Sequence, residues 1–176
     1  MTRGGSSPLT RTMLYINCTD FGGIQMEPLE FEETARCQKA DVHVDLWETS
    51  DVEVGISIPL NTSADDFPIE KDIEWINEKR QEICDFIISQ GFVECAKEWS
   101  GISNISSDEF CKSLYFDSTR INYRGWEKGR PGRITLYLHC NPDYFSGHIV
   151  EVRIKIEGVL KTENTIKIFS ECCLAG

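Results

Sequence analysis

The most regular segment of the chain reads His148-Ile149-Val150-Glu151-Val152-Arg153-Ile154-Lys155-Ile156-Glu157. From Val150 onward apolar and charged residues alternate, so the valines and isoleucines share one face and the charged residues share the other. A period of two is typical of a strand with one side buried and the other in water. The segment therefore predicts a β-strand in a sheet that is covered on one face.

The same alternation recurs on both sides of this segment. Residues 42–46 and 52–58 repeat the pattern around a connection at 48–51, which predicts an N-terminal hairpin. Weaker strand signals lie at 118–123, 133–140 and 165–169, between segments rich in glycine, asparagine and proline. Antiparallel pairing of these strands with residues 148–157 predicts a C-terminal meander.

The longest helical pattern begins at Ile69. Apolar residues recur there at helical spacing, and Gly91 follows as a stop signal, so one main helix is expected over 69–90. Either Asp65 or Asp66 is expected to cap its beginning. Residues 25–39, which precede the hairpin, are acidic and poorly periodic and are expected to form a loop or a short covering segment.

Two shorter helices are expected after the main one. One covers residues 92–99, and the other opens at a capping box from Ser106 to Glu109 and ends near Leu114. The predicted fold class is α+β, with a mainly antiparallel sheet of N-terminal hairpin plus C-terminal meander and two or three helices packed on one face. Residues 14–176 are expected to form a single α+β domain, preceded by a disordered tail at 1–13.

The composition is acidic. The chain has 176 residues, with 18 Lys and Arg against 29 Asp and Glu, for a formal charge of -11. Such a negative field repels phosphate backbones and anionic lipid headgroups, so no nucleic acid or membrane partner is expected, and a basic protein is the natural counterpart. The alternative is that the charge only keeps the protein soluble.

The eight cysteines are scattered, with no Cys-x-x-Cys spacing. Together with the lack of a secretory signal or an apolar stretch of membrane-spanning length, this distribution predicts reduced core thiols in a cytoplasmic protein. No cofactor is expected, because the phosphate-cradling loop, the dinucleotide turn and the nucleophile elbow are all absent from the sequence.

Two groups of residues are candidates for a site. A glycine-rich loop and its flanks carry the candidate binding residues Arg124, Trp126, Lys128, Arg130 and Arg133, which are suited to an anion or a protein partner; alternatively, the charges only solubilise a turn. The second group is His139, Cys140 and His148, whose imidazole and thiolate ligands would suit zinc if they converged. Otherwise these histidines are structural.

The segment Tyr144-Phe145-Ser146-Gly147-His148-Ile149-Val150-Glu151-Val152 resembles the signature of a bacterial domain family of unknown function. In that family an aromatic-x-Gly-His turn leads into an amphipathic strand, which implies a structural role for Phe145, Gly147 and His148. The resemblance extends to residues 75–88, 98–99 and 107–110. Related small acidic bacterial domains are suspected of acting as immunity proteins, which bind and block a toxin.

The leading hypothesis is therefore a non-catalytic binding domain of the toxin-immunity type, which uses an acidic surface to dock a basic protein such as a toxin. The alternative is a small metal-dependent hydrolase with a site near His139, Cys140 and His148. A third reading is an accessory domain that packs against another chain. The oligomeric state is left open.

Overall fold

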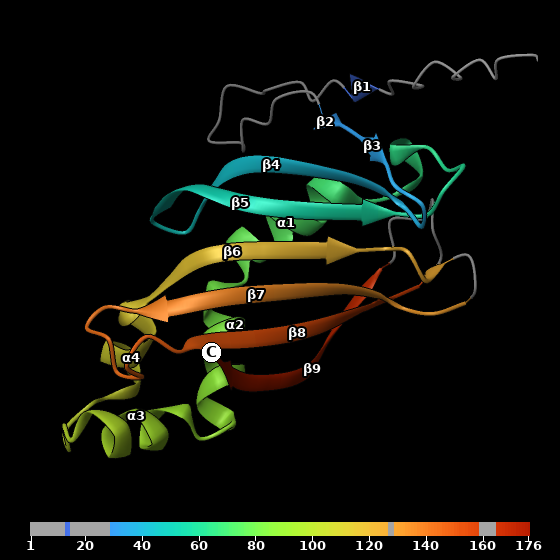
Figure 1. Ribbon diagram of the computed structural model, residues 1–176. Helices are drawn as coiled ribbons and strands as arrows, with labels where there is room; N and C mark the ends of the chain where they lie inside the picture. Colours follow the sequence, from blue (N-terminus) through green and yellow to red (C-terminus); the bar gives the residue numbers. More distant parts are fainter. Residues whose placement is uncertain (1–12, 15–28, 127–128, 159–164) are drawn as a thin grey trace, which may run out of the picture.

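The computed structural model describes residues 13–14, 29–126, 129–158 and 165–176 (Figure 1). The tail predicted at 1–13 lies outside this part of the chain except for Met13. Seven of the described strands form one sheet in the order β3-β4-β5-β6-β7-β8-β9. They are β3 (Glu32–Glu33), β4 (Gln38–Leu46), β5 (Thr49–Ile58), β6 (Leu114–Asn122), β7 (Gly132–Cys140), β8 (Ile149–Glu157) and β9 (Ile166–Ala175).

The predicted hairpin and meander are both present, as β4–β5 and β6–β9, and every pair within them is antiparallel. The two units join at β5 and β6, which run parallel, with Val54 opposite Thr119 and Ile56 opposite Ile121. Parallel neighbours need a long crossover, and this one contains the four described helices. The fold is thus α+β with a mostly antiparallel sheet.

The segment 25–39 was expected to lack regular structure, and its described part contains more strand than predicted. A short strand β2 (Leu29–Glu30) pairs with β1 (Met13–Leu14), β3 follows, and β4 already begins at Gln38. β2 pairs outside this segment and β3 pairs with the start of β4 inside it, and each is only two residues long, so the local pattern carries little sign of them.

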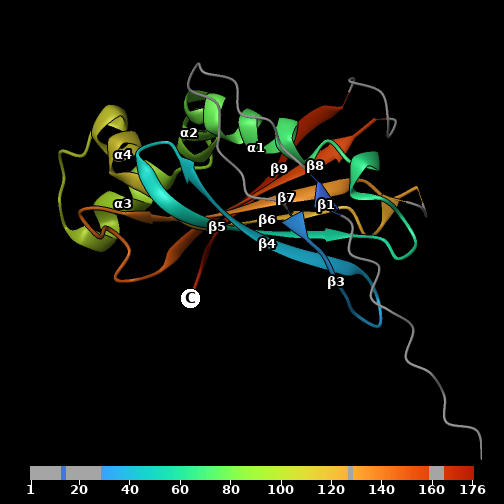
Figure 2. The same cartoon turned by 90° about the horizontal axis from the view of Figure 1, so that it is seen from above.

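The four described helices are α1 (Ile69–Glu78), α2 (Arg80–Ser89), α3 (Phe92–Ser100) and α4 (Ser107–Ser113). In Figures 1 and 2, α1 and α2 lie on one side of the sheet, while α3 and α4 lie beyond the end where β6 starts and β7 finishes. The opposite face of the sheet carries no described helix. This arrangement gives the sheet one covered and one open face.

The single helix predicted over 69–90 is wrong, because the chain leaves helical geometry at Lys79 and continues as α2. The Ile76 carbonyl, one turn earlier, accepts a hydrogen bond from the Trp47 indole of the β4–β5 turn. Helices kink where a foreign side chain enters the backbone ladder, which accounts for a break at this point.

The predicted cap of the main helix is also wrong. Asp65 and Asp66 belong to a separate 3-10 turn (Ala64–Asp66) capped by Ser63, and α1 starts after Pro68 with no side-chain cap. The capping box at α4 is confirmed, because the Ser106 hydroxyl accepts from the Glu109 backbone N–H and the Glu109 carboxylate accepts from the Ser106 backbone.

The core lies between the covered face of the sheet and the helices. Val150, Val152, Ile154 and Ile156 of β8 are fully buried, as their alternation predicts. They belong to one apolar cluster with the buried isoleucines of α1 and α2, which are Ile69, Ile73, Ile76, Ile83 and Ile87. Burying a side chain of this size contributes roughly 1.5–3 kcal/mol. The open face is left to charged and aromatic side chains.

Candidate binding surface

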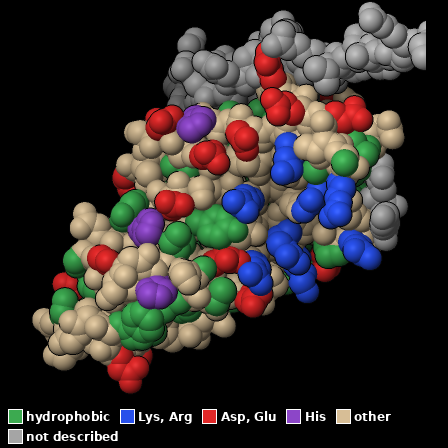
Figure 3. Space-filling model, viewed as in Figure 1, with side chains coloured by type: hydrophobic (Ala, Val, Ile, Leu, Met, Phe, Trp, Pro, Cys, Tyr) green, Lys and Arg blue, Asp and Glu red, His purple; other side chains and the backbone are tan. Residues whose placement is uncertain are grey.

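Charge is separated on the open face of the sheet. Figure 3 shows Lys and Arg side chains gathered over one half of this face, whereas Asp, Glu and His lie mainly over the other, with some carboxylates bordering the cations. The acidic half lies over the β4–β5 hairpin, whose outward positions include Asp41, Asp45 and Glu53. We call four of the exposed cations outside the hairpin the basic patch; they are Arg120, Arg124, Arg133 and Lys155.

The basic patch is built from three strands and one loop. Arg133 of β7 and Lys155 of β8 lie directly opposite each other. Arg120 of β6 holds its guanidinium carbon 5.5 Å from the ring centroid of Tyr137. The Arg124 side chain donates to the side-chain oxygen of Asn122 at 3.2 Å. Among the described residues, no carboxylate forms an ion pair with any of these four cations.

Arg153, on the same face of β8, is neutralised. Its guanidinium pairs with Glu151 beside it and with Glu171 on β9, the latter at 2.6 Å. These contacts raise the pKa of the Arg153 side chain, first through the hydrogen bond that Arg153 donates to the Glu151 carboxylate. Carboxylates are therefore available to cations on this face, but the basic patch has none from the described residues.

A small pocket of about 220 Å³ lies at the end of the sheet beside the basic patch. It is lined by Trp126, Gly129, Arg130, Pro131, Ile156, Glu157 and Gly158. The Trp126 ring is half-buried and meets Tyr123 edge to face, with ring centroids 6.3 Å apart. Of the loop residues predicted to bind, Trp126 and Arg130 share this pocket and Arg124 and Arg133 lie in the patch, whereas Lys128 lies outside the described residues.

The signature residues form a tight turn against the helices. Ser146 and Gly147 both have positive φ, and the His148 backbone N–H donates to the Phe145 carbonyl at 3.1 Å. His148 Nδ1 lies 2.8 Å from the same carbonyl oxygen. The Phe145 ring is fully buried and packs edge to face on Phe92, Trp99 and Phe110. This geometry supports a structural role in the entry to β8.

The second candidate group does not come together. His139 points to the open face, where it stacks on Tyr115 and lies 3.6 Å from Asp117, whereas Cys140 is the next residue of the strand and is buried on the other face. His148 is held in its turn against Trp99. Across the described ranges, no group of three His, Cys, Asp or Glu side chains is placed to hold a metal.

The described cysteines are free thiols. Burial raises the pKa of Cys84 to about 12, and that of Cys140 to about 11. The pKa of Cys172 rises to about 12, again mainly through burial. Because the thiolate is the nucleophile, these thiols are unreactive at neutral pH.

Carboxylates cover the outer surface of the first three helices. We call the exposed ones the acidic helix surface; they are Glu74, Glu78, Glu82, Asp85, Glu94 and Glu98. Two of them are paired with lysines of the same helical layer, Glu82 with Lys79 at 2.6 Å and Glu94 with Lys97 at 2.7 Å. The pKa of Glu70 is raised, by partial burial and then by the charge of Glu74, as expected where negative charges crowd.

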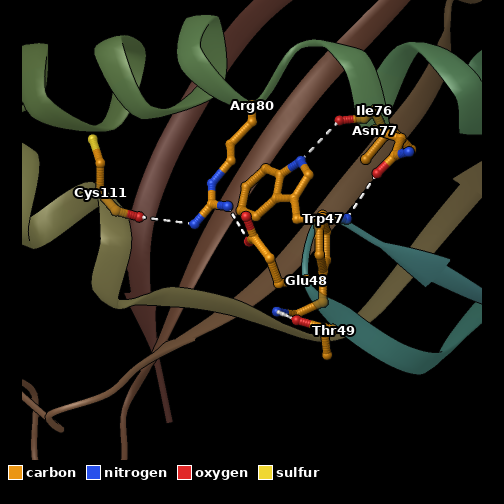
Figure 4. Close-up of polar contacts among 8 residues, drawn as sticks. Trp47, Glu48, Thr49, Ile76, Asn77, Arg80 and Cys111 are labelled. Atoms are coloured by element: carbon orange, nitrogen blue, oxygen red, sulfur yellow. Dashed lines mark hydrogen bonds and ion pairs between the residues drawn. The ribbon is translucent and has the colours of Figure 1, made fainter.

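Sequence reasoning missed a contact network at the hairpin turn (Figure 4). The Trp47 backbone N–H donates to Asn77 Oδ1 at 2.7 Å, and its indole N–H donates to the Ile76 carbonyl at 3.2 Å. Arg80 lies over the Trp47 ring and pairs with Glu48. Trp47 adopts a φ of 53°, which is uncommon for a side chain of its size and gives the turn its shape.

Sequence reasoning also missed a buried polar group beneath the sheet. Asp72 of α1 is fully buried; it accepts from the Tyr123 hydroxyl at 2.5 Å and pairs with Lys167 of β9 at 2.7 Å. Burial raises the pKa of Asp72, opposed by its bonds to Lys167 and Tyr123. Burial, and next the charge of Asp72, raises the pKa of Tyr123 well above its usual value. The group ties the first helix to the last strand.

Among the described residues, no helix has the length and apolar character needed to cross a membrane. No curated protein and no solved structure matches the chain. A family model does match, over residues 29–165, and its description is an uncharacterised protein conserved in bacteria, DUF2262. The match covers most of the chain, from β2 through the whole crossover to the end of β8. The chain is therefore a member of the bacterial DUF2262 family, whose function is not known.

Proposed function

We propose that the protein is a non-catalytic binding domain of the toxin-immunity type, which docks a basic protein partner on its acidic helix surface. The observation that carries the proposal is the row of exposed carboxylates along α1, α2 and α3, most of which have no lysine or arginine partner among the described residues. These three helices present the exposed carboxylates to the outside of the molecule.

Because cations are concentrated in the basic patch, the electrostatic potential over the rest of the molecule, including the acidic helix surface, is more negative. Setting the four cations of the basic patch aside leaves 14 Lys and Arg against the 29 Asp and Glu of the whole chain. A field of this sign steers a basic partner toward the helices and disfavours acidic competitors. Steering of this kind weakens as salt is added, because the Debye length falls from about 30 Å at 0.01 M to about 10 Å at 0.1 M.

The chemistry of the described side chains favours binding over catalysis. The histidines and Cys140 of the hydrolase alternative point in different directions, and the buried thiols are protonated at neutral pH. The polar group at Asp72 is sealed in the core, where its carboxylate is fully buried. Each of these features suits a domain that acts through its surface.

The test measures binding to the basic proteins encoded beside the gene, each purified and titrated at low and high salt. We expect one of them to bind, and the double substitution Glu74→Gln and Glu78→Gln to weaken binding by about tenfold, or roughly 1.4 kcal/mol. The matched control is Glu53→Gln with Glu157→Gln, which removes the same charge from the open sheet face and leaves affinity unchanged. Binding that is equal in both double variants contradicts the proposal, as does the absence of any such partner.

A further inference from the structure

Arg133 of β7 and Lys155 of β8 place two like charges directly opposite each other on the open face of the sheet. Directly opposite residues on antiparallel strands have Cβ atoms about 4.5–5.5 Å apart, and like charges in this position destabilise the pair. Neither residue has a carboxylate partner among the described residues, although the chain contains 29 Asp and Glu. None of the carboxylates in the described part of this acidic chain neutralises the pair.

The neighbouring strands add to the same excess of charge. Arg120 of β6 lies in the row next to Arg133, because Asn122, two residues further along β6, is the direct partner of Arg133. Adjacent strands are about 4.8 Å apart, so the three cations lie within roughly 10–12 Å of one another. Arg153, on the same face, has two carboxylate partners, which makes the basic patch a local exception rather than a general feature of the sheet.

We propose that the basic patch is a docking surface for an acidic polypeptide segment, separate from the acidic helix surface. The partner's carboxylates would supply the neutralising charges that the described part of this chain does not. Two exposed aliphatic side chains of β9 border the patch, Ile168 directly opposite Lys155 and Ile166 directly opposite Glu157. Cations beside exposed isoleucines suit a segment that mixes acidic and apolar residues.

A nucleic acid fits this surface less well. Single strands bind proteins largely by stacking bases on free aromatic rings, and both tyrosines of the open face are occupied, Tyr137 by Arg120 and Tyr115 by His139. Duplex DNA carries a charge about every 1.7 Å, and so dense a line of charge is repelled by a protein of charge -11 more strongly than a sparsely charged peptide is.

The test is fluorescence anisotropy with a labelled peptide of alternating Glu and Val, at an ionic strength of about 0.01 M, where screening is weak. We expect the whole chain to bind the peptide, and the double variant Arg133→Gln with Lys155→Gln to bind it at least about tenfold more weakly. The control, Arg36→Gln with Lys112→Gln, removes the same charge from exposed positions outside the patch and changes affinity by less than about threefold.

Three results overturn the proposal: no binding of the peptide by the native chain, equal losses in both double variants, or tighter binding of a single-stranded oligonucleotide of equal charge that is lost in the Arg133 and Lys155 variant. The melting temperature of each variant establishes that it is folded. The patch variant is expected to be at least as stable as the native chain, because it relieves a like-charge contact. Substitutions at Glu74 and Glu78 are expected to leave peptide binding intact, so this proposal and the proposed function can be tested separately.

Discussion

Arg80 holds its guanidinium carbon 5.0 Å from the ring centroid of Trp47, joining the start of α2 to the turn of the β4–β5 hairpin. The same side chain pairs with Glu48 and reaches the Cys111 carbonyl at 3.5 Å, so one residue links the hairpin to two helices. Trp47 in turn packs on Phe116 of β6, with ring centroids 4.5 Å apart. These contacts hold the N-terminal hairpin to the rest of the fold.

Removing this link is expected to destabilise the protein. Arg80→Gln should lower the free energy of unfolding by about 1–2 kcal/mol, because the cation–π contact and the ion pair are both lost. Glu48→Gln is the comparison, and it should cost less than about 0.5 kcal/mol because the Glu48 side chain is 79% exposed. Urea denaturation measures both. Equal losses would show that the ion pair, and not the ring contact, dominates.

Reversing one charge of the opposed pair is expected to stabilise the sheet. Lys155→Glu places a carboxylate directly opposite Arg133 and should raise the free energy of unfolding by about 0.5–1 kcal/mol at low salt. The gain should shrink at 1 M salt, where the Debye length is about 3 Å. Thermal melts at the two salt concentrations test this, and a loss of stability at low salt would mean that the two cations do not repel each other.

The turn before β8 contains backbone strain at Ser146 that a substitution can relieve. Ser146 has a φ of 54°, a left-handed conformation that costs a residue with a Cβ about 1–2 kcal/mol. Ser146→Gly should therefore stabilise the protein by about 0.5–1 kcal/mol, after the entropy cost of glycine is included. The same substitution at Ser50, which lies in the extended backbone of β5, should destabilise it. Chemical denaturation of the two variants separates backbone strain from a general effect of glycine.

Alkaline pH should destabilise the fold through Cys84. The unfolded thiol ionises near its usual pKa of 9.0, whereas burial raises the pKa of the folded thiol to about 12. The folded state then keeps a proton that the unfolded state has lost, so the free energy of unfolding falls as pH rises through this window, by up to about 1.4 kcal/mol per pH unit for one group. In Cys84→Ala the slope between pH 9 and 11 should be shallower, whatever the cost of the substitution at pH 7.

The buried ion pair of Asp72 and Lys167 should make the stability difference between the native chain and a Lys167 variant depend on acidic pH. Lys167→Met leaves the fully buried carboxylate of Asp72 without its cation and should cost about 3 kcal/mol or more at pH 7. The pKa of Asp72 is raised above 3.8, mainly by burial, so acid protonates it readily. The stability difference between native and variant chains should therefore shrink as pH falls toward that pKa. A difference that stays constant with pH would mean that Asp72 is neutral in the native state.

Local signals in the sequence correctly predicted β8 and the start of α4, whereas the helix break at Lys79 depends on a contact with the distant Trp47. Alternation in β8 follows directly from which side chains are buried, and the Ser106 capping box forms within a few residues of chain. The parallel pairing of β5 with β6 could not be predicted in this way, because it joins residues separated by the whole helical crossover. No short-range pattern in the sequence specifies such a neighbour.

The candidate surface was predictable only in part for the same reason. The loop cations Arg124 and Arg133 stand close together in the sequence and could be singled out. Arg120 and Lys155 join them only through the register of three strands, so the basic patch is a product of sheet topology. Composition alone predicted a uniformly negative protein and could not predict the sorting of charge by surface.

The parallel junction between β5 and β6 also bears on how the chain reaches its native state. The hairpin closes through a tight turn between Leu46 and Thr49, and the strands of the meander follow one another directly in sequence, so both units cost less loop-closure entropy than the junction does. The junction pairs Val54 with Thr119 and Ile56 with Ile121 across the whole crossover, so it is expected to form slowly and only after the helices have condensed. Trp47, at the hairpin tip, contacts Ile76 and Asn77 of α1, Arg80 of α2 and Phe116 of β6, so it joins the two halves of the sheet once they have met.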